Sequence, residues 1–146
     1  MKITIEEIGV TQEEEIIIRC REVNQEILDL YNKIRRHQSY ISASCGKEIY
    51  RVAFRDIFYF ETVDSKSFLY GNDRVYETKL KLYEFEEICG GTAFFRASKS
   101  VILNADKIQY VKPALSGRFE ATLKNGEKVV VSRQYVQDLK RALGML

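Results

Sequence analysis

The sequence predicts a mainly β domain with some helix, an α+β protein built on antiparallel strands. From residue 40 onward, short stretches alternate apolar with polar residues, and turn residues separate them at short intervals. Aromatic residues are plentiful, with nine tyrosines and eight phenylalanines against a single proline. The 146 residues suffice for one ordinary core with a small appendage. We therefore expect one antiparallel β domain preceded by a small β-β-α element.

The β-β-α element is predicted over residues 1–38. Isoleucines alternate with polar residues at its start, and residues 16–20 form a second β-branched run, so we expect two short strands. From Glu22 to Arg36 the apolar residues recur at helical spacing and form one apolar face. So small a unit cannot bury that face alone. The expected role of residues 1–38 is dimerisation or docking, and the expected assembly is a homodimer.

The antiparallel domain is predicted over residues 39–146. Turn residues such as Gly71-Asn72-Asp73 favour tight hairpins between its first strands. A short helix over residues 80–88 should end at Gly90-Gly91, and Asn104 should cap a turn. The strands are expected at residues 40–44, 48–53, 57–62, 67–71, 74–78, 93–96, 101–103 and 108–114.

The last strands and the last helix have the clearest local pattern. Residues 118–131 alternate around Asn125-Gly126, which predicts a hairpin with a two-residue turn. Ser132 then precedes apolar residues at helical spacing, from Tyr135 to Leu143, and is expected to cap a final helix.

The composition excludes most catalytic chemistry. His37 is the one histidine, so a mechanism that needs a histidine pair, a histidine-rich metal site or a Ser-His-Asp triad has almost no material in this sequence. The sequence lacks the GxxxxGK[ST] and GxGxxG loops that bind nucleotide phosphates. Carboxylates such as Glu61 and Asp64 occur at the density of an ordinary solvated surface. We expect a protein that is not an enzyme, with no catalytic residues, no metal site and no cofactor.

Targeting and redox patterns favour a cytoplasmic protein. The longest apolar runs hold only a few residues, against about 20 for a membrane span, so no membrane insertion is expected. The acidic start lacks the apolar core of a signal peptide. Cys20, Cys45 and Cys89 are odd in number and widely spaced, which predicts reduced and mostly buried thiols instead of disulfides.

Basic residues and polar clusters concentrate in the part that follows residue 45. Residues 1–45 hold six basic and eight acidic residues, whereas residues 46–146 hold 17 basic and 13 acidic. Three clusters that mix hydroxyls with a cation follow strand ends, at residues 64–67, 96–100 and 132–134. Serine and lysine donate to phosphate oxygens, and arginine pairs with guanine in the major groove. From spacing alone, these clusters are also explained as ordinary polar turns.

Three stretches of the sequence occur in an order and spacing that match a known family. They are Ile57 to Glu61, Phe94 to Asn104 and Leu123 to Tyr135. By these stretches, residues from about 40 to 143 resemble the LytTR family of DNA-binding domains. In the middle stretch, Arg96, Ser100 and Asn104 fit the family pattern, whereas Ser98 and Lys99 replace its histidine and arginine.

The resemblance implies antiparallel strands whose loops and strand ends enter the major groove of DNA. In the first cluster the implied contact is Ser67 or its neighbour Lys66. Arg133 would otherwise be a cation beside the positive end of a helix, an unfavourable position. Arg96 is expected to act in the fold first and on phosphate second. A phosphate contact at Lys99 would survive, but its base preference would change because lysine lacks the planar fork of arginine. The DNA-binding residues expected from the resemblance are Lys66, Ser67, Ser98, Lys99, Arg133 and Arg96.

The implied function is a sequence-specific, double-stranded DNA-binding transcriptional regulator. Only about 40 residues precede the resemblance, too few for a phosphoacceptor receiver domain, so we expect a stand-alone regulator. Control by dimerisation, by expression level or by a regulatory protein partner stays open. A LytTR-like protein-interaction module without DNA binding also stays open. The presence of Ser98 and Lys99 in place of the family's histidine and arginine supports this alternative. An RNA-binding role fits less well, because exposed aromatic pairs are not evident.

Overall fold

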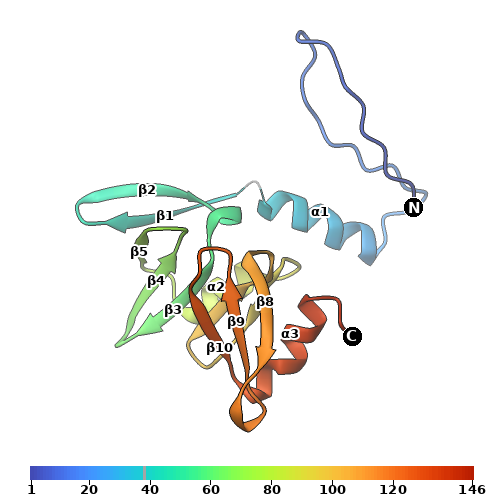
Figure 1. Cartoon of the computed structure of the whole chain (residues 1–146). Coiled ribbons are helices and arrows are strands. Elements are labelled where there is room, and N and C mark those ends of the chain that lie inside the picture. The colour runs from blue at the N-terminus through green and yellow to red at the C-terminus, as the bar shows by residue number, and fades with distance from the viewer. Residues whose placement is uncertain (38) are drawn as a thin grey trace.

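Two antiparallel sheets and three α-helices make up the part of the chain that the structure describes (Figure 1). The structure is a computed structural model, and it describes residues 1–37 and 39–146. The larger sheet has seven strands in the order β2-β1-β5-β4-β3-β7-β6, and the smaller sheet has three in the order β10-β9-β8. The elements are α1 (Gln25–His37), β1 (Tyr40–Cys45), β2 (Glu48–Ala53), β3 (Tyr59–Val63), β4 (Lys66–Tyr70), β5 (Val75–Thr78), α2 (Leu82–Ile88), β6 (Phe94–Arg96), β7 (Val101–Asn104), β8 (Ile108–Pro113), β9 (Phe119–Leu123), β10 (Lys128–Val131) and α3 (Val136–Ala142).

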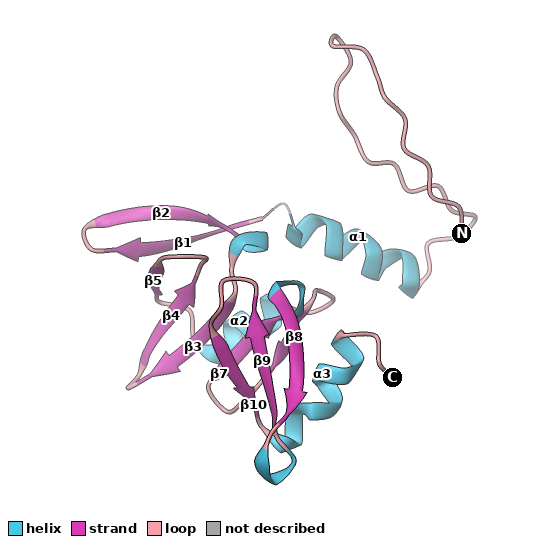
Figure 2. Cartoon of the chain, viewed as in Figure 1, coloured by secondary structure: helices cyan, strands magenta, loops and turns pink. Residues whose placement is uncertain are grey.

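The strand pairing confirms the predicted α+β class. All the described ladders are antiparallel, and Figure 2 shows strands as the dominant element. Four single 3-10 turns complete the framework: η1 (Phe54–Asp56), η2 (Ala105–Lys107), η3 (Leu115–Gly117) and η4 (Arg133–Tyr135). No helix in the described ranges is long and apolar enough to cross a membrane.

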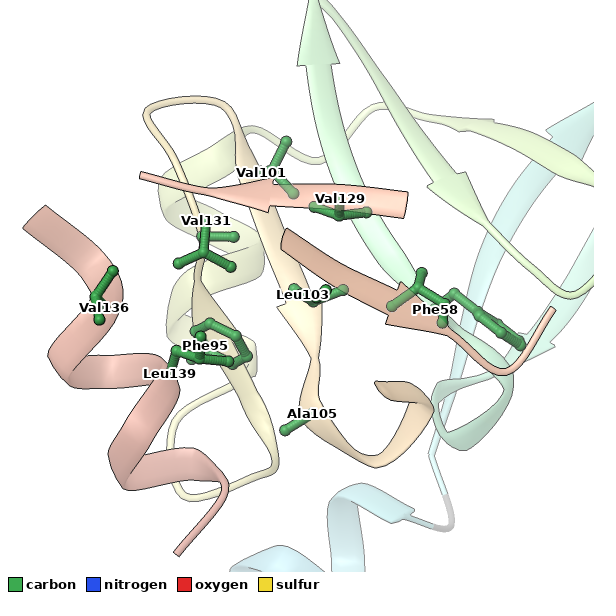
Figure 3. Packing of buried hydrophobic residues seen from close by; sticks show 12 residues of the cluster. Phe58, Phe95, Val101, Leu103, Ala105, Val129, Val131, Val136 and Leu139 are labelled. Carbon is green, nitrogen blue, oxygen red and sulfur yellow. The ribbon is translucent and has the colours of Figure 1, made fainter. Parts of the chain in front are cut away.

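One apolar cluster joins the smaller sheet and α3 to the larger sheet. Leu103 of β7, Leu123 of β9 and Leu139 of α3 have no exposed surface. Figure 3 shows the side chains of this cluster gathered between α3 and the strands. The tight burial fixes the ends of β6, β7 and β10 relative to one another, because interiors pack at crystal-like density.

A second apolar cluster covers the other face of the larger sheet with α2. The ring of Phe85 in α2 stacks on that of Phe60 in β3, with centroids 4.5 Å apart. Along β7, Ile102 belongs to this second cluster, whereas its neighbour Leu103 belongs to the first. The alternation shows that β7 is buried on both faces, as the continuous apolar run Val101–Leu103 requires.

The two strands expected before residue 21 are wrong. Residues 1–24 contain no helix or strand, and Ile3 and Ile5 are 90% and 92% exposed. A two-stranded ribbon with no further surface to cover its apolar side is marginal in water, which explains the open chain. The predicted helix is confirmed as α1, and Asn24 caps it by accepting a hydrogen bond from the Ile27 N–H at 3.0 Å. The expected boundary at residue 38 falls on a residue outside those described.

The predicted hairpin around Asn125-Gly126 is confirmed, but its two-residue turn is wrong. Residues 124–127 lie between β9 and β10, and the Gly126 N–H donates to the Leu123 carbonyl at 2.9 Å. Gly126 has a φ of 89°, whereas Asn125 is not among the residues with positive φ. The loop therefore has a type I turn followed by a glycine bulge. The Asn125 side chain instead accepts from the Glu127 N–H at 3.1 Å and donates to the Asn72 carbonyl at 3.1 Å, which ties the hairpin to the larger sheet.

The two predicted side-chain caps have different outcomes. Asn104 is 3% exposed, and its side chain accepts from the Asp106 N–H at 3.0 Å and donates to the Ile57 carbonyl at 2.9 Å. That cap is confirmed. Ser132 makes no side-chain cap, because the single turn η4 intervenes between it and α3. Only the Ser132 carbonyl takes part, accepting the Tyr135 N–H at 2.9 Å.

The three cysteines are free, as expected, but they differ in burial. Cys89 is buried, Cys45 is half-buried and Cys20 is exposed. Burial raises the pKa of the Cys89 thiol well above its usual range, so this thiol stays protonated. The expectation of mostly buried thiols is therefore wrong for Cys20, which lies in the open chain before α1.

Candidate nucleic-acid interface

The three polar clusters predicted from the sequence lie together at one end of the β domain. The Thr62 N–H donates to the Ser100 carbonyl at 2.9 Å, which joins the end of β3 to the β6–β7 loop. The Ser132 N–H donates to the Ala97 carbonyl at 2.8 Å, which joins the end of β10 to the same loop. We call this end, formed by the β3–β4 turn, the β6–β7 loop and the β10–η4 connection, the loop end.

The first cluster is a tight turn that presents Lys66. β3 and β4 pair up to Val63 opposite Lys66, so only Asp64 and Ser65 form the turn. These two residues have φ values of 50° and 64°, as a type I′ turn requires. Lys66 is exposed at the tip of this hairpin. Its neighbour Ser67 is only 8% exposed, so Lys66, and not the Ser67 side chain, is accessible to a ligand at this turn.

The second cluster is a loop that Arg96 holds in shape. The Nε of Arg96 donates to the Ser98 carbonyl at 2.6 Å, and one terminal nitrogen donates to the Lys99 carbonyl at 2.7 Å. The other terminal nitrogen forms an ion pair with Glu86 of α2 at 2.8 Å. With all its nitrogens engaged, Arg96 is a positioning residue for the loop, which agrees with its expected primary role in the fold.

The loop that Arg96 holds presents Lys99 to solvent. The Lys99 side chain is exposed, whereas Ser98 is half-buried. The Ser98 hydroxyl accepts a hydrogen bond from the Ser100 N–H at 3.3 Å. Ser98 thus shapes the loop locally, and Lys99 is the residue of this cluster with a free cationic group for a ligand.

The third cluster presents Arg133 and depends on a glycine that the sequence analysis missed. Arg133 is the exposed first residue of η4. A Cβ atom on Gly117 would lie 2.9 Å from Cδ and 3.1 Å from Cγ of Arg133, closer than side chains normally approach. Gly117 also has a φ of 74°, a conformation that favours glycine. The Ser116-Gly117 pair is a turn pattern in the sequence, but nothing in the sequence connects it with Arg133.

The loop end therefore has the chemistry of an anion-binding surface built on a rigid frame. Lys66, Lys99 and Arg133 are exposed on three short connections, and backbone hydrogen bonds join those connections. Lysine and arginine donate to phosphate oxygens, and arginine also forms a bidentate pair with guanine. Among the described residues, no group of three or more histidine, cysteine or carboxylate side chains is placed to hold a metal ion.

The sequence of this β domain is similar to the sequences of known bacterial proteins. A family model described as the LytTr DNA-binding domain matches residues 47–144. The sensory transduction protein LytT of Enterococcus faecalis is 34% identical over 97 residues, which cover 66% of this chain and 40% of that protein. The sensory transduction protein LytT of Bacillus subtilis is 26% identical over 125 residues, which cover 86% and 52%. The transcriptional regulatory protein LytR of Staphylococcus aureus is 32% identical over 71 residues, which cover 49% and 29%.

A solved structure shares the fold. A LytTr DNA-binding domain from Bacillus cereus matches 73% of this chain and 98% of its own length, with a TM-score of 0.68 and 27% sequence identity. The chain spans about half of the length of the first relatives above, 40% and 52%. The predicted resemblance is therefore confirmed for the β domain, and it does not extend over the whole length of those relatives.

Proposed function

The chain belongs to the LytTR family of DNA-binding domains, and from this membership we propose that it is a sequence-specific regulator of transcription that contacts the major groove of double-stranded DNA with its loop end. One observation carries the choice of surface. Lys66, Lys99 and Arg133 come from three connections far apart in the sequence, and the backbone hydrogen bonds of the loop end join these connections. Such a surface has donors for phosphate oxygens and for base edges.

The three cations have different proposed roles. Arg133 pairs with a guanine, because a planar guanidinium donates to O6 and N7 together. Lys66 and Lys99 neutralise phosphates, because an ammonium group is a point charge without a fixed donor plane. Arg96 and Ser98 act through the shape of the β6–β7 loop, and Ser67 through the pairing of β4. In this proposal Arg133 gives the preference for a DNA sequence, and Lys66 and Lys99 give affinity for DNA of any sequence.

The proposed assembly is a homodimer that binds paired DNA sites. Residues 1–38 form the proposed dimerisation element, and α1 supplies an apolar stripe with no buried residue. A regulator of this kind would act in the cytoplasm, where bacterial DNA lies, as a stand-alone protein or with a regulatory partner. Two copies of one loop end would contact two copies of one DNA motif, as a symmetric dimer requires.

Titration against a fluorescent library of duplex DNA at two salt concentrations tests the proposed function. The unmodified protein should enrich a repeated motif. Arg133→Ala should lose about 1–3 kcal/mol of binding free energy and relax the preference at one base pair. Lys66→Ala should weaken binding to all sequences alike and lower the salt slope by about 1.

Lys47 supplies the matched control, because it is also an exposed lysine in a hairpin turn, between β1 and β2. Lys47→Ala should leave the affinity, the motif and the salt slope unchanged. Equal losses from Arg133→Ala and Lys66→Ala would contradict the division of roles. Absence of binding at low salt would contradict the proposed function itself and favour a protein-interaction module.

A further inference from the structure

The end of the β domain opposite the loop end has a basic cleft that the proposed DNA contacts do not use. Two adjoining hollows of about 270 and 480 Å³ share Asp56, Lys107 and Lys124 in their walls. We call them together the basic cleft. Three aspartates line it, against twice as many lysines and arginines. The cations are Lys33, Arg51, Arg55, Arg74, Lys107 and Lys124.

The cations of the basic cleft form no close ion pair within the described ranges 1–37 and 39–146. The ion pairs found there involve other side chains. Instead, Arg51 lies over the ring of Tyr40 at 4.5 Å and Arg74 over the ring of Tyr50 at 4.8 Å, measured to the ring centroids. These ring contacts hold the guanidinium groups in place without supplying a carboxylate, and the cleft keeps an excess of positive charge. A concave surface with excess positive charge favours an acidic occupant.

The segment before α1 has the complementary charge and lacks a partner surface. We call residues 1–24 the arm. The arm holds six glutamates against three lysines and arginines. It contains no helix or strand, and its isoleucines at positions 3 and 5 are almost fully exposed. Figure 1 shows the arm beyond the N-terminal end of α1, away from the sheets. An acidic segment with exposed isoleucines is suited to a surface that offers cations and apolar contact.

The apolar stripe on α1 can pair two copies of the chain, and this pairing can bring the arm of one copy to the basic cleft of the other. Val23, Ile27, Leu30 and Ile34 recur at spacings of four, three and four residues, which is the core pattern of a coiled coil. No residue of α1 is fully buried: Ile27, Leu30 and Ile34 are half-buried, and Val23 beside the helix is 64% exposed. The stripe therefore keeps apolar surface that the same stripe of a second copy can cover.

Charges beside the stripe favour an antiparallel pair of α1 helices. Glu26 and Lys33 lie seven residues apart on one flank of the stripe. When two copies of α1 run in opposite directions, Glu26 of one copy faces Lys33 of the other, and two-fold symmetry repeats the pair. A parallel pair places these two charges at opposite ends of the helices.

The antiparallel arrangement also brings the second copy's arm to the cleft. Lys33 and His37, at the C-terminal end of α1, line the basic cleft. The 13 residues of α1 span about 20 Å. A chain's own arm begins at the far end of this length, whereas the arm of an antiparallel partner begins beside the cleft. The geometry thus favours exchange between copies over folding back.

We propose that two copies form a reciprocal dimer, in which the α1 helices pair antiparallel and the acidic arm of each copy lies in the basic cleft of the other. This inference rests on the proposed self-association and adds the surfaces that form it. The loop ends face away from the shared region and stay uncovered for DNA.

Charge reversal on the two surfaces tests the reciprocal dimer. One full-length variant carries Glu13→Lys, Glu14→Lys and Glu15→Lys in the arm, and the other carries Arg55→Glu and Lys124→Glu in the cleft. Sedimentation equilibrium at micromolar concentration measures the dimer Kd. Each variant alone should show a Kd raised about tenfold or more, because like charges then meet. An equimolar mixture should restore a heterodimer near the original Kd, because the reversed arm meets the reversed cleft and the original arm meets the original cleft.

A variant with Lys47→Glu and Lys79→Glu controls for net charge, because both lysines are exposed and neither lines the basic cleft. Its dimer Kd should stay unchanged. The proposal is overturned if the unmodified protein is monomeric, if neither reversal weakens the dimer, or if the mixture stays monomeric, which would place each arm in its own cleft. DNA titration of the unmodified protein separates the two proposals: a dimer that binds no DNA would refute the proposed function and leave the dimer standing.

Discussion

The two ends of the β domain use the same residue types in opposite settings. At the loop end, Lys66, Lys99 and Arg133 project from short connections, and none of them lines the basic cleft. At the cleft end, lysines and arginines surround a hollow, and several lie over aromatic rings. Donor groups that project from a surface can enter a DNA groove. Donor groups that line a hollow can instead bind an acidic segment that enters the hollow. On the two proposals, the location of a cation relative to the strand ends determines which kind of partner it can bind.

The largest effect is expected from a residue that supports both ends. Phe85 has no exposed surface and stacks on Phe60 of β3, the strand that runs from the cleft end to the loop end. Phe85→Ala should lower the free energy of unfolding by about 3–5 kcal/mol, because it leaves a large cavity. Urea denaturation measures this loss. Hydrogen exchange should quicken at both ends, and a change confined to one end would show that the ends are independent units.

A smaller effect, limited to the loop end, is expected from Arg96→Lys. Lysine has a single nitrogen and cannot reproduce the planar fork with which Arg96 reaches the Ser98 and Lys99 carbonyls from two nitrogens, so the β6–β7 loop loses part of its support. The free energy of unfolding should fall by about 1–3 kcal/mol. The ion pair with Glu86 adds little to this figure, because that carboxylate is half exposed.

Arg74→Lys at the cleft end is the matched control for Arg96→Lys. Arg74 has a ring contact with Tyr50 at 4.8 Å, and it is exposed. Its replacement should lower the free energy of unfolding less than that of Arg96 does. Urea denaturation compares the two variants, and hydrogen exchange shows where protection is lost. Equal losses would mean that Arg96 supports the loop no more than an ordinary surface cation does.

Much of the fold was predictable because its information is local. Strand alternation and turn residues predicted all but the details of the β domain, and Asn104 was correctly expected to cap a turn. The predictions were wrong where the local structure depends on contacts with residues distant in the sequence. Residues 1–24 have the alternation of strands but find no sheet to join. Asn125 has the sequence of a two-residue turn, yet its side chain bonds to Asn72 and the turn takes another form.

The residue types of the proposed site follow from the sequence, but the contacts that bury or hold these residues do not. Lys66, Lys99 and Arg133 follow strand ends, and a sequence shows this directly. The burial of Ser67 and the three-way bonding of Arg96 depend on neighbouring strands and on α2. The contact between Gly117 and Arg133 joins residues from different connections, so no local pattern could reveal it.

Two glycines, one at each end, allow a direct comparison. Gly117 and Gly126 have φ values of 74° and 89°, so alanine at either position should cost about 1–2 kcal/mol of stability. Only at Gly117 would the new methyl group meet Arg133, at 2.9 Å, whereas nothing lies within 4 Å at Gly126. Gly117→Ala should therefore displace the Arg133 side chain and weaken DNA binding, by at most as much as Arg133→Ala does, and Gly126→Ala should not. Similar DNA affinities for both glycine variants would separate Gly117 from the DNA-binding surface.

The smallest expected effect is an alkaline sensitivity of the cleft end. Tyr70, at the end of β4 there, donates its hydroxyl to Glu61 at 2.9 Å and stacks on Tyr59. Burial, followed by the bond to Glu61 and its charge, raises the pKa of Tyr70 to about 12, and the pKa of Tyr59 shifts in the same direction. A raised pKa means that the folded state favours the neutral phenol. The resulting stability is complete below pH 10 and is lost as the pH rises from about 10 to 12.

Urea denaturation of the unmodified protein and of Tyr70→Phe, at pH 8 and at pH 11, measures this contribution. Tyr70→Phe cannot ionise at this position, so its stability should fall less between the two pH values than that of the unmodified protein. Tyr110→Phe is the control, because Tyr110 is 51% exposed. The stability of this variant should fall between the two pH values as much as that of the unmodified protein. The loop end has no hydrogen-bonded tyrosine pair of this kind among the described residues, so hydrogen exchange at pH 11 should quicken around Tyr70 before it does around Lys99. Simultaneous loss of protection at both ends would mean that the whole sheet, and not the cleft end, responds to the ionisation.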